Sequence, residues 1–150
     1  MALVHLESEP PKVLVVDDDP GSMDSLTRLL SKAGMVALPA YNEQQCLEQV
    51  KQGEVDVIVV DVMMPGMDSF AICAVLKKMA SACSIPIILL TARDDLDTHL
   101  AAMRLGVSEF ILKPARVHDL LTRIRVHIEF NRKAREMDQA LNSLPEAAIY

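Results

Sequence analysis

Residues 12–20 read KVLVVDDDP and combine a strand signal with a helix start. Four consecutive apolar residues follow Lys12, and such an uninterrupted run predicts a strand buried on both faces of a sheet. Asp19 followed by Pro20 is typical of a helix N-cap and first turn. Apolar residues then recur at helical spacing until Gly34. The stretch therefore predicts a buried strand that passes directly into a helix.

The same alternation continues along the chain. Further strands are expected at residues 35–40, 55–61, 85–91 and 107–112, and further helices at 42–53, 66–80, 94–105 and 115–142. Five strands alternating with five helices require parallel strands joined by right-handed crossovers, which gives an open three-layer α/β sheet. The short connections suit a compact flavodoxin-like domain and leave no room for a lid.

Apolar side chains of two helices are expected to cover the sheet, and the cysteines are expected in the core. These side chains are Leu96, Leu100 and Met103 in the helix at 94–105, and Val117, Leu121, Ile124 and Ile128 in the last helix. The three cysteines, Cys46, Cys73 and Cys83, lack the spacing of a metal site and are expected to be reduced core residues.

Length and composition limit the class of protein. A chain of 150 residues with 51% apolar and 24% charged residues can bury the core of one domain. We expect a flexible lead at 1–11, the folded domain at 12–128 and a helical extension or linker at 129–150. The net charge of −6 argues against nucleic-acid binding. No apolar run approaches the roughly 18 residues of a membrane span, so we expect a cytoplasmic protein.

Polar residues follow four of the predicted strands, where sites form in open parallel sheets. They are Asp17, Asp18 and Asp19 after the first strand, Asp61 after the third, Thr91 after the fourth and Lys113 after the fifth. Carboxylates this close repel one another and need a cation, and oxygen ligands favour Mg²⁺. A metal, a lysine and a hydroxyl around a carboxylate suit a phosphoryl group. The alternative is that the aspartates only cap helices, as we expect of Asp19.

Four motifs, in this order, carry a resemblance to a known family: VLVVDDD at 13–19, DVMMPGMD at 61–68, TA at 91–92 and KP at 113–114. Residues 12 to about 128 resemble the receiver domain of two-component response regulators. The resemblance implies a sheet with strand order 2-1-3-4-5.

The resemblance also implies a role for each site residue. Asp61 would be the phosphoacceptor, and Mg²⁺ or Mn²⁺ would be bound by Asp17, Asp18, Asp61 and the backbone carbonyl of Met63. Asp18 would ligate the metal directly and Asp17 through water. Thr91 would be the switch hydroxyl and Phe110 the switch aromatic residue. Lys113 would neutralise the phosphoryl group, and its peptide bond to Pro114 would be cis.

Two residues depart from the pattern of that family. Ser69 stands where a glycine commonly follows the equivalent of Asp68, and we expect it to stiffen the loop beside the metal. Ala115 replaces the aromatic residue that commonly follows the Lys-Pro pair, which removes bulk at the start of the last helix. Because neither residue is a metal ligand or the acceptor, the domain is expected to be phosphorylatable.

We therefore expect a phosphoryl-accepting switch that receives its phosphoryl group from a histidine kinase or a phosphotransfer protein. Phosphorylation would change the surface formed by the helix at 94–105, the strand at 107–112 and the last helix. The chain would not be an enzyme beyond catalysing its own phosphorylation and slow dephosphorylation. A phosphorylation-independent interaction domain stays open as the alternative. An aspartate-nucleophile phosphatase is less favoured, because such enzymes need an acid two residues after the nucleophile, where Met63 stands, and a cap for which the short connections leave no room. A flavodoxin-like cofactor binder is disfavoured because the first-strand aspartates would repel its phosphate.

The last helix carries a second apolar stripe. Phe130, Ala134, Met137, Leu141 and Leu144 follow one another at spacings of four, three, four and three. The pattern predicts about two heptads of a coiled coil, in a helix that joins two copies or transmits a signal. The alternative is an ordinary amphipathic tail. Residues 141–150 are similar to the segment that begins a PAS sensor domain, so an output or PAS domain is a possible continuation.

Overall fold

The computed structural model describes residues 9–62, 68–79, 81–92 and 96–142. Its elements are β1 (Lys12–Val16), α2 (Pro20–Lys32), β2 (Val36–Ala40), α3 (Glu43–Gln52), β3 (Val57–Asp61), α4 (Ser69–Lys78), β4 (Ile87–Thr91), α5 (Leu96–Arg104), β5 (Glu109–Leu112) and α6 (Val117–Asn142). The strands pair in parallel in the order β2-β1-β3-β4-β5. The predicted sheet and its strand order are confirmed.

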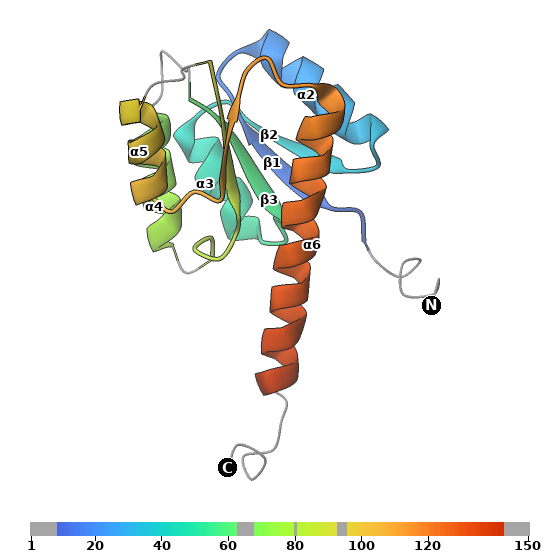
Figure 1. Ribbon diagram of the computed structural model, residues 1–150. Coiled ribbons are helices and arrows are strands. Elements are labelled where there is room, and N and C mark those ends of the chain that lie inside the picture. Colours follow the sequence, from blue (N-terminus) through green and yellow to red (C-terminus); the bar gives the residue numbers. More distant parts are fainter. Residues whose placement is uncertain (1–8, 63–67, 80, 93–95, 143–150) are drawn as a thin grey trace.

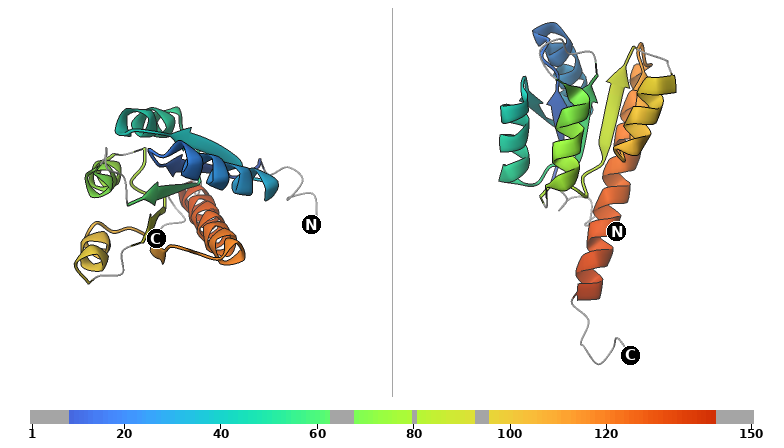
Figure 2. Two further views of the ribbon diagram at one scale, coloured as in Figure 1. Left: turned by 90° about the horizontal axis from the view of Figure 1, so that it is seen from above. Right: turned by 90° about the vertical axis from the view of Figure 1, so that its left-hand side faces the viewer.

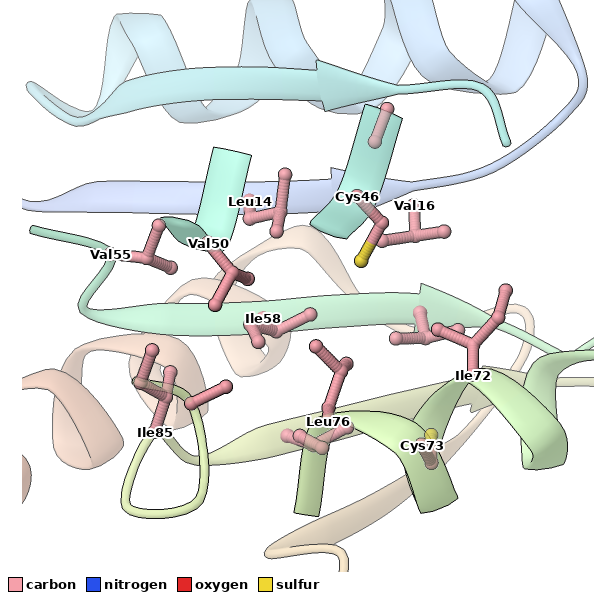
Figure 3. Close-up of a cluster of buried hydrophobic side chains, with 14 of the residues drawn as sticks. Leu14, Val16, Cys46, Val50, Val55, Ile58, Ile72, Cys73, Leu76 and Ile85 are labelled. Carbon is pink, nitrogen blue, oxygen red and sulfur yellow. The ribbon is translucent and has the colours of Figure 1, made fainter. Parts of the chain in front are cut away.

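Helices cover both faces of the sheet and give the fold its three layers (Figures 1 and 2). Helices α2 and α6 lie on one face, and α3, α4 and α5 lie on the other. Figure 3 shows the core beneath α3 and α4, where Leu14 and Ile58 of the central strands meet side chains from both helices. None of the helices in the described ranges is both long and apolar enough to cross a membrane.

The central strands β1 and β3 explain why the sheet is buried on both sides. Alternate residues point to opposite faces of a strand. In β1, Leu14 and Val16 therefore join the core beneath α3 and α4, while Val13 and Val15 join the core beneath α2 and α6. Every residue of β3 is buried, including Asp61 at its carboxyl end. The fold thus carries an ionisable side chain to the edge of an apolar core.

Helix starts follow the capping residues that the sequence provides. The Asp19 side chain accepts a hydrogen bond from the Ser22 backbone N–H at 2.8 Å, which confirms its predicted capping role. Asp68 caps α4 in the same way, accepting from the backbone N–H groups of Phe70 and Ala71. These caps fix where each helix leaves the carboxyl edge of the sheet.

The predicted inner face of α5 is wrong. Leu96, Leu100 and Met103 are 72%, 42% and 63% exposed, while Thr98 and Ala102 are buried. A helix of nine residues has too few turns for spacing alone to define its inner face, and the small Ala102 takes the position against the sheet. Three large apolar side chains therefore lie on the outer surface of the domain.

Two further placements differ from the predictions. In α6 the buried face begins at Leu120 and continues through Ile124 and Ile128, while Val117 is 54% exposed because it lies in the first turn of the helix. Leu121 is half-buried against that core. Cys46 and Cys73 are buried as predicted, but Cys83 is exposed because it lies in the turn before β4.

The second half of α6 continues past the body of the domain (Figure 1), and an ionic cluster fixes its base. Asp56 is 3% exposed, immediately before β3. Its carboxylate accepts from Arg132 Nε at 2.9 Å and Nη2 at 3.0 Å, and from Arg135 Nη2 at 2.8 Å. The backbone N–H of Lys12 donates to the same group at 2.9 Å. We call these three side chains, Asp56, Arg132 and Arg135, the Asp56 clamp.

Candidate functional site

The centre of the site is an ion pair between the ends of β3 and β5. The Lys113 Nζ donates to Asp61 Oδ2 at 2.7 Å. The Asp61 side chain is 8% exposed and that of Lys113 is 34% exposed, so the carboxylate lies inside the site and the ammonium group at its rim. The backbone N–H of Lys113 also donates to the Thr91 carbonyl at 2.7 Å, and the Lys113–Pro114 peptide bond is cis as expected.

Asp17 lies beside this pair and is itself buried. The pKa of Asp17 is raised from its ordinary value of 3.8 to about 6. Burial is the main cause, the charge of Asp61 adds to it, and a hydrogen bond from the Asp19 N–H opposes it. Two carboxylates held together in a poorly solvated place repel each other when both are ionised. The geometry therefore favours either a shared proton or a bound cation.

The donor atoms of this site fit a hard divalent ion. Oxygen ligands of carboxylates suit Mg²⁺ or Mn²⁺, and Asp17 and Asp61 supply two such groups. Asp18, half-buried, follows Asp17 in the same loop. Over the described ranges, no group of three or more His, Cys, Asp or Glu side chains is arranged to hold a metal ion. Met63, whose carbonyl was predicted as a ligand, lies outside the described residues.

Ser69 makes a contact that the sequence did not predict. It is 2% exposed at the first position of α4, and its hydroxyl donates to the backbone carbonyl oxygen of Asp61 at 2.6 Å. The departure from the glycine pattern was visible in the sequence. The hydrogen-bond partner of the Ser69 hydroxyl was not visible, because a main-chain carbonyl eight residues away carries no sequence signal.

The predicted switch residues lie on two neighbouring strands. Thr91 ends β4 and is fully buried. Phe110 of β5 is half-buried, and its ring lies 4.8 Å from the ring of His99 on α5, at an interplanar angle of 40°. His99 is exposed, and no sequence motif marks its contact with Phe110. A side chain on α5 therefore contacts the residue predicted to respond to the acceptor.

Comparison with known proteins agrees with this geometry. A family model, the response regulator receiver domain, matches residues 13–125. This chain belongs to that family. The chain is 34% identical over 133 residues to response regulator MprA of Mycobacterium ulcerans (strain Agy99), covering 89% of this chain and 56% of that protein. It is also 34% identical over 129 residues to transcriptional regulatory protein YvrH of Bacillus subtilis (strain 168), covering 85% and 53%.

Solved structures resemble the receiver domain as well. The signal receiver domain of an HD domain-containing protein from Pseudomonas fluorescens Pf-5 is 27% identical, with a TM-score of 0.77 over 86% of this chain and 94% of that chain. The chain spans about half the length of the curated relatives it matches. The similarity therefore covers only part of each of these longer proteins.

Proposed function

We propose that this receiver domain is a phosphoryl-accepting switch of a two-component phosphorelay, with Asp61 as the acceptor. The observation that carries the proposal is the buried Asp61 carboxylate, with the Lys113 ammonium group at 2.7 Å and Asp17 beside it. An Asp61 oxygen would attack phosphorus, and a P–O bond would form as the P–N bond to the donor histidine breaks. Lys113 would neutralise charge on the transferred phosphoryl oxygens.

A divalent metal would complete the site. Asp17, Asp18, Asp61 and the Met63 backbone carbonyl would hold Mg²⁺ or Mn²⁺, which when bound adds positive charge beside the phosphoryl oxygens. The raised pKa of Asp17 supports this assignment, because a bound cation would offset both the burial and the Asp61 charge that raise it. Ser69 would hold the main chain of Asp61 in place while the acceptor reacts.

Phosphorylation would change the face formed by α5, β5 and α6. Thr91 would move to bind the phosphoryl group and Phe110 would follow it, which would alter its contact with His99. The exposed Leu96 and Met103 support a role for this face in binding a partner, because they are large apolar side chains left in solvent.

The partners we propose are a sensor histidine kinase or phosphotransfer protein upstream, and an output or PAS domain downstream. A second copy of the chain would join through the exposed stripe of α6. The proposed setting is the cytoplasm, which the buried thiols of Cys46 and Cys73, neither of them in a disulfide, support. Catalysis by the domain would be limited to its own phosphorylation and slow dephosphorylation.

Intact mass spectrometry after incubation with acetyl phosphate and Mg²⁺ tests the acceptor. We expect one added phosphoryl group, and none in Asp61→Asn. Asp24→Asn removes an exposed carboxylate on α2 and should still gain the group. No addition to the unmodified chain would overturn the proposal and favour a phosphorylation-independent interaction domain. Continuous release of inorganic phosphate at enzymatic turnover would instead favour a phosphatase.

A further inference from the structure

The outer face of α6 carries an unpartnered apolar stripe, formed by Phe130, Ala134, Met137 and Leu141. Phe130, Met137 and Leu141 are 75%, 71% and 62% exposed. Spacings of four, three and four place the four residues at alternating d and a positions of a heptad. Such a stripe on a helix that leaves the domain body suits a second helix of the same kind.

The other side of the same helix is already occupied. Ile124 and Ile128 lie in the core, and one to two turns later Arg132 and Arg135 bind Asp56. These contacts hold the helix formed and fix which side of it faces the core. Phe130 and Ala134 line an open cavity together with Ile85 and Pro86, and Met137 and Leu141 follow further along the helix. A preformed helix loses less conformational entropy on pairing than a free peptide, so a short seam can suffice.

Two charges flank the stripe and define its orientation. With Phe130 and Met137 at d, Lys133 is at g and Asp138 at e. In a parallel pair, a g residue faces the e residue five positions further along the partner helix, and Asp138 lies five positions after Lys133. Each Lys133 would then face an Asp138 of the other copy.

An antiparallel pair brings g beside g and e beside e. The g positions along the described part of the stripe are Val126, Lys133 and Ala140, and the e positions are Asn131 and Asp138. Neither set contains residues of opposite charge. No antiparallel register of these residues therefore gives either charge an opposite partner.

From this pattern we infer that two copies of the receiver domain pair through α6 as a parallel, in-register coiled coil. The inference rests on the proposed self-association and adds its direction and register. The two domain bodies lie at the same end of the pair, and the two chains leave it side by side. The partner is a second copy of this chain, recognised by Phe130, Met137 and Leu141 and by the Lys133 and Asp138 charges.

Disulfide trapping in the full chain tests the direction. In a Cys83→Ser background, which leaves only buried native cysteines, Ala134→Cys and Leu141→Cys are prepared separately and oxidised with and without acetyl phosphate and Mg²⁺. The two sites are one heptad apart, about 10 Å along the helix. A parallel in-register pair crosslinks both variants, whereas an antiparallel pair brings at most one site to its own copy.

Sedimentation of the same proteins distinguishes failure of the parallel arrangement from failure of self-association. A dimer that crosslinks at one site or at neither overturns the parallel arrangement and leaves self-association standing. A monomer in every condition overturns self-association and the coiled coil together. A crosslink at both sites supports the inference.

Swapping the charges at positions 133 and 138 gives an independent test, in which the dissociation constant of the dimer is measured. Lys133→Glu and Asp138→Lys should each weaken dimerisation about fivefold, and the two together should restore it. Glu136→Lys, a charge change off the seam, is the control and should have little effect. Circular dichroism checks that helix content is kept. Single and double variants of equal affinity would overturn the proposed contact between Lys133 and Asp138.

Discussion

The hydroxyl of Ser69 and the backbone carbonyl of Asp61 are joined by a buried hydrogen bond of 2.6 Å. The bond ties the first residue of α4 to the main chain of Asp61, the proposed acceptor, so the helix and the end of β3 form one unit. A family pattern with glycine at this position has no side chain to make such a bond. The arrangement is therefore a property of this chain.

Removal of that hydroxyl should destabilise the fold. We expect Ser69→Ala to lower the free energy of unfolding by about 1–3 kcal/mol, because a buried carbonyl loses a partner. Ser69→Gly should cost slightly more, since it also frees the backbone at the start of α4. Urea denaturation measures both, with Ser25→Ala on the surface of α2 as the control. If all three variants unfold like the unmodified chain, the bond contributes nothing to stability.

Asp17 should give the metal-free protein an unusual pH dependence. Burial raises its pKa from 3.8 to about 6, so the folded state holds this proton more tightly than the unfolded chain does. That stabilisation is fully present below about pH 4 and is lost as the pH rises through 6. From this group alone, the free energy of unfolding should fall by about 2–3 kcal/mol between pH 4 and pH 7.

The control for this effect is a comparison of Asp17→Asn with Asp24→Asn by urea denaturation in EDTA. Asp17→Asn should lose the decline and be more stable than the unmodified chain at pH 7. Asp24→Asn changes an exposed group and should keep the decline. Mg²⁺ should stabilise the unmodified chain more at pH 7 than at pH 5. Identical pH profiles for all three proteins would contradict the crowding of Asp17 and Asp61.

Loss of the Lys113 ammonium group should slow phosphorylation, which loss of a purely structural ion pair would not do. Lys113→Gln should slow phosphorylation by acetyl phosphate at least about tenfold, which corresponds to about 1.4 kcal/mol of barrier. The reason is that the Lys113 ammonium group lies 2.7 Å from Asp61 Oδ2, where it can neutralise the charge on the incoming phosphoryl oxygens. Intact mass against time gives the rate, and Lys32→Gln on the surface of α2 is the matched control. An unchanged rate with reduced stability would assign Lys113 a purely structural role.

The site was predictable to the extent that buried strands end in polar residues. Apolar runs locate Asp17, Asp61, Thr91 and Lys113 at strand ends, and parallel pairing then brings those ends to one edge. The contact between Lys113 and Asp61 confirms this reasoning across 52 residues of sequence. Which carboxylate would be buried was not predictable, since neighbouring aspartates look alike in sequence.

Other features were hidden for physical reasons. The inner face of α5 depends on Ala102, whose small side chain weighs little in any apolar pattern. The Asp56 clamp joins residues 76 and 79 positions apart. Charged residues on a long helix usually face solvent, and spacing does not show which of them meets a buried carboxylate. The pairing depends on where α6 lies along the sheet, which the sequence spacing does not give.

The Asp56 clamp should keep the second half of α6 helical and protected from opening. Burial acts to raise the pKa of Asp56, but the hydrogen bond from Arg132, with help from Arg135, holds it below its ordinary value. The clamp therefore stabilises the fold at neutral pH and weakens as the pH falls through that lowered pKa. Arg132→Ala should accelerate amide hydrogen exchange in residues 129–142 about tenfold or more, since it leaves the helix end free to open.

A double-mutant cycle separates the clamp from general effects of charge. Asp56→Asn and Arg132→Ala should each lower the free energy of unfolding by about 1–3 kcal/mol, and the double variant by less than their sum. Lys51→Ala removes an exposed cation of α3, away from the clamp and from the proposed seam, and should leave both stability and exchange almost unchanged. Additive losses in the cycle, or equal exchange in Arg132→Ala and Lys51→Ala, would show that the extension is ordered by its own helix propensity. Strong coupling would instead mean that the start of β3, whose far end carries Asp61, holds the helix that leaves the domain.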